Sequence, residues 1–345
     1  MALRRVTIQD IADACGLSRN TVSKVFNDRG AVLESTRREV LKKAQELGYF
    51  QMARKETALQ SLHLQNIALL TCHMPGDYHF GTFFISAFAA QMSRAGYTLM
   101  MYEITEDERR LGALPSQIHL EKTAAILMIE LFDREYIDRI CELELPALLV
   151  DGPFTSATSL INCDRVSMEN LASTMALVDH LISAGARRIG FVGDPQHCGS
   201  FHERFFGFRT AISNAGLTMD ESLCILERDD LPYDDIGKLS SRLLQMPQLP
   251  DALICVNDFV AIHVMAALKQ LGVSIPGQIM VTGFDGTAQS AVVEPSLTTV
   301  QIPGAEIGRI AADMLLNHIA NPGRLPICVY AKTVPIFRES TNRRI

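Results

Sequence analysis

Several features that mark other classes of protein are missing from this sequence of 345 residues. No apolar run approaches the ~18 residues that a membrane-spanning helix needs, and no signal segment precedes the first motif. The eight cysteines are scattered without a CxxC pair, so they read as small buried thiols of a reducing compartment. We therefore expect a cytoplasmic protein without a membrane partner.

Catalytic signatures are missing as well. We find no GxSxG elbow, no phosphate-binding glycine loop, and no set of nucleophile, base and acid. His79, His197, His202 and Cys198 could suggest a metal, but their spacing fits no ligand motif. We expect no cofactor, no metal and no enzymatic activity, so that the protein binds its ligand without transforming it.

Charge is divided unevenly along the chain. Residues 1–60 hold 11 Lys and Arg against 7 Asp and Glu, whereas the other 285 residues hold 21 against 32. A basic head on an acidic body suggests that only the head meets nucleic acid. With 48% apolar residues, the chain is long enough for two or three domains with ample core.

The segment "TIQDIADACGLSRNTVSKVFN" (7–27) has the pattern of two short helices joined by a tight turn. Thr7 is placed to cap the first helix in a capping box with Asp10. Gly16 is placed to end that helix, because glycine adopts a positive φ without strain. Ser18 is placed to cap the second helix. The pattern predicts a helix-turn-helix.

The second helix would bury Val22, Val25 and Phe26 and expose a polar face. Arginine and lysine suit guanine edges, asparagine suits adenine, and hydroxyls suit phosphate oxygens. The candidate DNA-contacting residues of this segment are Thr7, Ser18, Arg19, Asn20, Thr21, Ser23, Lys24 and Asn27. Taken alone, the segment leaves open a small amphipathic hairpin with an ordinary solvated face. A third helix, "STRREVLKKAQELGY", would complete an all-α head over 1–50.

From Asn66 onward, short apolar runs alternate with helical segments. The runs "NIALLTC", "TLMMYEI", "AAILMIE" and "ALLVDG" read as buried parallel strands, and a second series begins with a helix from Val166. This alternation predicts an α/β body over 66–345 with two doubly wound parallel-sheet lobes. We assign about 66–164 and 295–322 to lobe 1, and about 165–294 and 323–345 to lobe 2. Ligands of such folds bind beyond the carboxyl ends of the strands.

The order and spacing of these motifs resemble the LacI/GalR family of transcriptional repressors. The likeness covers nearly the full length, including the head, "HLISAGARRIGFVGD", "ERFFGF", "ICVND", "GFDG" and "EPSLTTVQIPGAEIGRIAADMLL". The resemblance implies a periplasmic-binding-protein-like body and a homodimer that reads a pseudo-palindromic DNA operator. It also implies a small-molecule effector between the lobes, with a sugar or sugar derivative favoured. A purine or a phosphocarrier protein as co-regulator is the alternative.

Carried onto this sequence, the resemblance predicts an effector site. The candidates are Tyr78, His79, Phe80, Asp151, Arg204, Asn257 and Asp285. Arginine donates in a rigid fork, aspartate accepts from hydroxyls and asparagine does both, which suits a polyol, while the aromatic run could form a wall for a sugar ring. Each polar candidate also has a structural interpretation. Asn257 could cap a helix, Asp285 could belong to a strand-end loop, and Arg204 could form a surface ion pair.

The linker over 51–65 departs from the family pattern, because the usual Pro-Asn pair does not follow Tyr49. Family hinges insert a leucine into the minor groove. In the family this leucine lies nine residues after the tyrosine that ends the head and eight residues before the first isoleucine of the body. Here the first count, from Tyr49, reaches Ala58, whereas the second, from Ile67, reaches Leu59. We choose Leu59, because a wedge must be bulky and apolar to unstack a base step. Arg54 would then flank the groove with positive charge.

Overall fold

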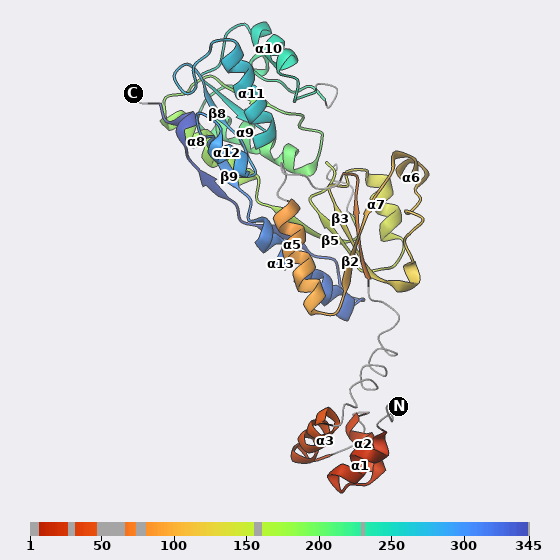
Figure 1. Cartoon of the computed structure of the whole chain (residues 1–345). Helices are drawn as coiled ribbons and strands as arrows, with labels where there is room; N and C mark the ends of the chain where they lie inside the picture. Colours follow the sequence, from red (N-terminus) through yellow and green to blue (C-terminus); the bar gives the residue numbers. More distant parts are fainter. Residues whose placement is uncertain are drawn as a thin grey trace. The chain divides into compact units, whose positions relative to one another are not determined.

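The computed structural model describes residues 7–26, 32–46, 66–73, 81–154, 161–228 and 232–343. The chain divides into two compact units, Met1–Gln65 and Asn66–Ile345, which we call the head and the body (Figure 1). The linker predicted over 51–65 lies outside the described residues. No helix in the described ranges is both long and apolar enough to cross a membrane.

The described part of the head, residues 7–26 and 32–46, contains the helices α1 (Ile8–Cys15), α2 (Arg19–Phe26) and α3 (Glu34–Glu46). Their buried contacts come from Ile11, Ala12, Val22, Val25 and Val40. This core is small, and it uses the apolar positions that recur at helical spacing in the sequence.

Side-chain caps fix the ends of the first two helices, as predicted. Thr7 and Asp10 form the capping box of α1, and Gly16 follows the helix with a φ of 63°. Ser18 Oγ accepts a hydrogen bond from the backbone N–H of Thr21 at 3.1 Å. These bonds satisfy backbone groups that a helix terminus leaves without intrahelical partners. The turn between α1 and α2 is therefore set by local sequence.

Lobe 1 of the body is built on a six-stranded parallel sheet of order β10-β5-β4-β3-β1-β2. The strands are β1 (Asn66–Thr71), β2 (Thr98–Glu103), β3 (Thr123–Ile129), β4 (Ala147–Val150), β5 (Asp164–Met168) and β10 (Cys328–Ala331). The helices are α5 (Gly81–Arg94), α6 (Glu106–Leu111), α7 (Arg134–Cys141) and α13 (Gly304–Ala320).

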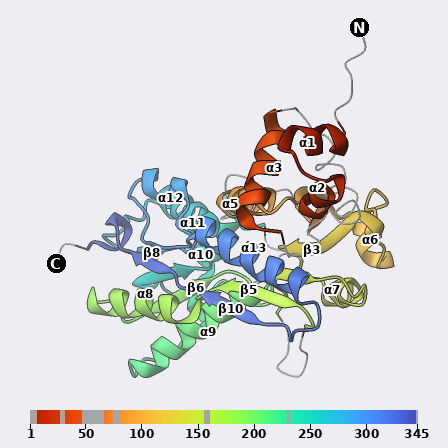
Figure 2. The ribbon, with the colours of Figure 1, turned by 90° about the horizontal axis from the view of Figure 1, so that it is seen from below.

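Helices cover both faces of this sheet. Helices α5 and α13 run side by side on one face, and α7 packs on the other (Figure 1). Figure 2 shows α13 lying along β5. Neighbouring residues of β3 point to opposite faces, so that Leu127 packs with the α5 and α13 side while Ile126 and Met128 pack with α7. Coverage on both faces explains the continuous apolar runs of the central strands.

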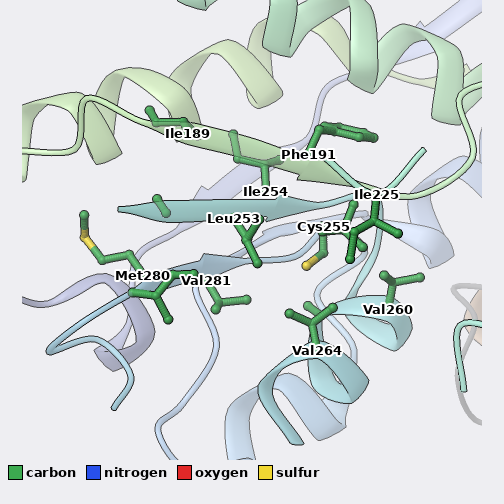
Figure 3. Close-up of a cluster of buried hydrophobic side chains, with 14 of the residues drawn as sticks. Ile189, Phe191, Ile225, Leu253, Ile254, Cys255, Val260, Val264, Met280 and Val281 are labelled. Carbon is green, nitrogen blue, oxygen red and sulfur yellow. The ribbon is translucent and has the colours of Figure 1, made fainter. Parts of the chain in front are cut away.

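Lobe 2 contains a three-stranded parallel sheet of order β6-β7-β8. Its strands are β6 (Ile189–Val192), β7 (Ala252–Cys255) and β8 (Met280–Thr282), and β9 (Thr299–Gln301) and β11 (Val334–Ile336) form an antiparallel pair. Its helices are α8 (Leu171–Ser183), α9 (Gly199–Asn214), α10 (Ile236–Gln245), α11 (Asp258–Gln270) and α12 (Ala288–Val292). Figure 3 shows Val260 and Val264 of α11 packed toward the strands that carry Leu253 and Val281.

Two short strands correct the predicted division of the lobes. We predicted a helix from Val166, but Asp164–Met168 form β5, and α8 begins only at Leu171. Strand β10, which falls in the segment assigned to lobe 2, pairs with β5 in the lobe 1 sheet. Strand β5 carries polar residues among its apolar ones, and β10 is a four-residue strand at the edge of the sheet. Their conformation is selected by long-range pairing rather than by local pattern.

Candidate ligand cavity

A cavity of about 510 Å³ lies between the two lobes of the body. Lobe 1 lines it with Cys72, His73, Arg109, Glu130, Phe132, Asp151 and Met168. Lobe 2 lines it with His197, Cys198, Ser200, Phe201, Arg204, Asn257 and Asp285. Most of these residues follow the carboxyl end of a parallel strand, which is where α/β folds bind ligands.

The four polar candidates Asp151, Arg204, Asn257 and Asp285 all line this one cavity. They come from four separate segments of the chain, and the topology brings them together. The aromatic candidates Tyr78, His79 and Phe80 lie outside the described residues.

Arg204, on α9, is buried and held in one orientation. Its Nε donates to Asn170 Oδ1 at 2.9 Å, and its Nη1 donates to the backbone carbonyl of Val256 at 2.8 Å. Its Nη1 also lies 3.3 Å from Asp285 Oδ1, and the guanidinium carbon lies 3.8 Å from the ring centroid of Phe284. The interpretation of Arg204 as a surface ion pair is therefore wrong, because only 4% of the residue is exposed.

Asp285 follows β8 in an unusual backbone conformation, with a φ of 116°. Its backbone N–H donates to the carbonyl of Val300 at 2.9 Å, which ties this turn to β9. Burial raises the pKa of Asp285 to about 7, because the charged form loses its hydration. Arg204 acts in the opposite direction, whereas the nearby carboxylates of Asp258 and Glu130 raise the pKa further. Asp285 therefore titrates near neutral pH.

A second carboxylate, Asp258 at the start of α11, supports the loop that carries Asp285. It accepts hydrogen bonds from Thr287 N at 2.7 Å, Thr287 Oγ1 at 3.0 Å and Thr299 Oγ1 at 2.5 Å. Burial raises the pKa of Asp258, and these hydrogen bonds lower it. A Cβ on Gly283 would lie 2.4 Å from Asp258 Oδ1, so the close approach of loop and carboxylate requires glycine.

Asn257 and Asp151 both make structural hydrogen bonds. The Asn257 Oδ1 accepts from Val260 N at 2.9 Å, which confirms the helix-cap interpretation. This cap uses only the oxygen, so the amide nitrogen keeps its two donors for another partner. The Asp151 Oδ1 accepts from Gly152 N and from Ser200 Oγ, each at 2.8 Å, and the second bond joins lobe 1 to lobe 2.

Unusual backbone conformations concentrate at the cavity. The non-glycine residues with positive φ in the described ranges are Glu130, Glu144, Asp151 and Asp285. All of them except Glu144 line the cavity. Such a conformation costs on the order of 1–3 kcal/mol, and it persists where the surrounding structure determines it. The fold therefore holds carboxylates at strand ends in positions that local preference alone would not select.

An aromatic group that the sequence analysis did not identify also lines the cavity. The ring centroid of His197 lies 5.0 Å from that of Phe132 and 4.9 Å from that of Phe201. From the sequence, His197 was a candidate only as a metal ligand. In the part of the chain that the structure describes, no group of three His, Cys, Asp or Glu side chains could hold a metal ion. The sequence feature that could have indicated this aromatic group is the position of Phe132 and His197 shortly after strands β3 and β6.

A different cavity, of about 520 Å³, lies between α8 and the C-terminal segment. Its polar side chains are committed to the fold. Arg338 Nη1 donates to Ser290 Oγ and to the carbonyl of Leu297, each at 2.9 Å. The ring of His180 stacks on Phe337 with centroids 4.1 Å apart. We therefore assign this cavity to packing of the C-terminal segment.

Most of the predicted DNA-contacting side chains that the structure describes are exposed on the head. Arg19, Asn20 and Lys24 are exposed on α2, whereas Thr21 and Ser23 are half-buried. Thr7 and Ser18 are exposed, and their hydroxyls are used as helix caps. The remaining candidates, Asn27, Arg54 and Leu59, lie outside the described residues.

Sequence comparison gives the same division into head and body. The family model described as bacterial regulatory proteins, lacI family, matches residues 7–51, and the model of a periplasmic binding protein-like domain matches residues 178–341. The HTH-type transcriptional repressor PurR of Aliivibrio salmonicida is 28% identical, with 91% of this chain and 92% of the relative covered. The HTH-type transcriptional repressor CytR of Escherichia coli is 26% identical, with 93% and 94% covered.

Solved structures share the fold of the whole chain. A transcriptional regulator CelR–cellobiose complex has a TM-score of 0.71 at 23% identity, with 97% of this chain and 100% of that chain covered. The lac repressor dimer bound to operator and the anti-inducer ONPF has a TM-score of 0.68 at 20% identity, with 98% and 99% covered. A helix-turn-helix head joined to such a body defines a DNA-binding transcriptional regulator. The chain thus carries the head of the lacI family of bacterial regulatory proteins and a periplasmic binding protein-like domain, and the relatives that it matches over nearly its full length are transcriptional repressors.

Proposed function

We propose that this regulator is a repressor, that it binds a pseudo-palindromic operator as a homodimer, and that a carbohydrate in the 510 Å³ cavity controls its operator affinity. The observation that carries the proposal is the convergence of Asp151, Arg204, Asn257 and Asp285 on one cavity between two lobes. A ligand that contacts both lobes can favour one arrangement of them, and only its differential affinity for the arrangements can change DNA binding.

On the DNA side, the exposed face of α2 supplies the proposed base contacts. Arg19 and Asn20 lie in its first turn, and Lys24 lies one turn later. Phosphate contacts would come from the hydroxyls near the helix N-termini, where backbone N–H groups and the helix dipole also favour an anion. On this proposal Asn27, Arg54 and Leu59 complete the interface, with Leu59 as the minor-groove wedge.

The cavity suits a polyhydroxylated ring. Its volume of about 510 Å³ lies within the usual range of small-molecule sites, roughly 300–1,000 Å³. Asp285 accepts from hydroxyls when ionised and donates one hydrogen bond when protonated, and both states are populated near neutral pH because its pKa is about 7. Phe132 and Phe201 offer apolar surface to the ring faces. One structural neighbour is described as a cellobiose complex, which supports a carbohydrate here.

The aromatic group also favours a second candidate ligand, a purine. Phe132, His197 and Phe201 place three rings at one side of the cavity, and a planar base would stack against them. We infer that the body binds its ligand without transforming it, since the curated relatives with which it shares its length are repressors.

A thermal-shift panel tests the proposal. Cellobiose, ribose, glucose 6-phosphate and hypoxanthine would each be titrated against the full chain, because a ligand at 100 times its dissociation constant stabilises by about 2.7 kcal/mol. A response to a sugar is expected in the wild type and in the Arg209→Ala control, whose exposed arginine lies on the same helix. Arg204→Ala should lose the response. A sugar response that survives in Arg204→Ala would refute the assignment of the cavity, and a response to hypoxanthine alone would select the purine.

A further inference from the structure

Three side chains outside the cavity form a hydrogen-bonded connection between the lobes. Arg165 on β5 donates from Nη2 to the hydroxyl oxygen of Tyr330 on β10 at 2.8 Å. The Tyr330 hydroxyl in turn donates to Glu203 Oε1 on α9 at 3.2 Å. The guanidinium carbon of Arg165 also lies 5.8 Å from the Tyr330 ring centroid. Tyr330 thus uses its single proton toward Glu203 and a lone pair toward Arg165, so the donors and acceptors are matched.

The connection continues inward to the cavity. The second oxygen of Glu203 accepts from Asn170 Nδ2 at 2.8 Å, and Asn170 Oδ1 accepts from Arg204 Nε at 2.9 Å. Asn170 is 1% exposed and lies on the segment that joins β5 of lobe 1 to α8 of lobe 2. Burial raises the pKa of Glu203, while its bonds to Asn170 and Tyr330 lower it. A half-buried carboxylate of this kind depends on its hydrogen-bond donors.

The step between Tyr330 and Glu203 is where the connection crosses from one lobe to the other. Arg165 and Tyr330 belong to neighbouring strands of the lobe 1 sheet, in which Val166 pairs with Val329. Glu203 belongs to α9, which packs on α8 in lobe 2. The Tyr330–Glu203 hydrogen bond therefore stabilises only the arrangement in which these two lobe surfaces lie together. A motion that separates these surfaces breaks this bond, whereas the other bonds of the connection stay within one lobe or on the connecting segment.

We propose that Arg165, Tyr330 and Glu203 form an interlobe latch that favours the lobe arrangement seen here and thereby regulates the effector site. The proposal rests on the proposed function in that the effector binds between the lobes. One such hydrogen bond is expected to change the ratio of two lobe arrangements by about two- to tenfold. The latch acts on the separation of the lobes rather than by touching the ligand.

The test measures the lobe separation directly, without any effector. Leu111 in lobe 1 and Leu244 in lobe 2 are exposed, at 68% and 70%, and each would be replaced by a spin-labelled residue for distance measurement by pulsed electron resonance. Labelled full-length protein would be diluted with unlabelled protein so that pairs within one chain dominate. Tyr330→Phe keeps the ring beside Arg165 and removes only the hydroxyl. We expect a shifted or broadened distance distribution, with the melting temperature nearly unchanged.

Three further variants make the test decisive. Tyr102→Phe removes the hydroxyl of a half-buried lobe 1 tyrosine on β2, and it should leave the distribution unchanged. Arg165→Asn should reproduce the effect of Tyr330→Phe, and the double variant should show no additional change, because both residues act through one bond. An unchanged distribution in Tyr330→Phe, or additive effects in the double variant, would overturn the latch. If no sugar stabilised the protein in the thermal-shift panel but Tyr330→Phe still changed the distance distribution, only the proposed effector would be rejected.

Discussion

Arg204 Nη1 and Asp285 Oδ1 lie 3.3 Å apart, with 4% and 10% of the two side chains exposed. The pair joins α9 to the loop after β8 at the wall of the cavity. A buried ion pair adds little net stability, because both charges lose hydration, but removal of one partner leaves the other uncompensated. The pair is therefore better suited to holding a charged, oriented surface toward a ligand than to stabilising the fold.

The titration of Asp285 gives the first prediction. Burial raises its pKa to about 7 in the folded protein, whereas an aspartate in the unfolded chain titrates near ~3.9. The folded state therefore keeps a proton that the unfolded state loses between these values. This contribution to stability is complete below pH ~4 and is lost as the pH rises to ~7, by up to roughly 4 kcal/mol. Urea unfolding across this range should show a smaller decline of the unfolding free energy in Asp285→Asn than in the wild type.

The matched control is Asp179→Asn, which changes an exposed carboxylate on α8. It should retain the wild-type dependence of the unfolding free energy on pH. If Asp285→Asn and the wild type gave parallel curves between pH ~4 and ~7, Asp285 would not carry the raised pKa.

Local features of the fold were predictable from the sequence. The capping box of Thr7 and Asp10 depends on residues three positions apart, and the central strands are apolar because helices cover both faces of the sheet. β5 and β10 were missed, since their conformation depends on pairing between residues far apart in the chain, such as Arg165 and Cys328.

The candidate site was predictable only in part, for the same reason. The polar candidates stand at strand ends, and family resemblance points to them. The hydrogen bonds of Arg204 to Asn170 and of Asn170 to Glu203 have no local signature, because α9 meets the β5–α8 connection only in the folded chain. Nothing in the sequence distinguishes the half-buried Glu203 from an ordinary helix-surface glutamate.

Close packing of α13 on α5 gives the second prediction. A Cβ on Gly308 would lie 2.4 Å from the backbone carbonyl oxygen of Phe84, so alanine there would force the helices apart. Gly308→Ala should lower the free energy of unfolding by about 1–3 kcal/mol. Gly323→Ala is the control, because no heavy atom lies within 4 Å of its added Cβ. Chemical denaturation of both variants measures the difference, and equal stability would contradict the close approach.

Base reading by the head gives the third prediction. Arg19→Ala or Asn20→Ala should cost about 1–3 kcal/mol of operator binding and relax preference at one position in each half-site. Half-sites should lie about one helical turn apart, and affinity should fall steeply with salt. Selection from random DNA, followed by titration of single-base variants, measures both effects. An equal loss of affinity for every DNA sequence would show that these side chains contact only the sugar-phosphate backbone of the DNA.

The buried carboxylate of Asp164 gives the fourth prediction. It is 0% exposed and accepts hydrogen bonds from Arg324 Nη1 and Ile327 N, each at 2.9 Å. His318 Nδ1 lies 3.0 Å from its Oδ2. Asp164→Asn would leave the guanidinium of Arg324 without its counter-ion in a largely buried position. The free energy of unfolding should therefore fall by about 3–5 kcal/mol.

An exposed ion pair provides the comparison for Asp164. Asp107 and Arg110 lie 3.1 Å apart, but their side chains are 82% and 75% exposed, so water screens the attraction. Asp107→Asn should change the free energy of unfolding by no more than about 1 kcal/mol. Chemical denaturation in low and high salt would measure both variants, and the Asp164→Asn loss should persist at high salt because the pair is shielded from ions. If the two variants lost equal stability, burial would not be the cause of the difference.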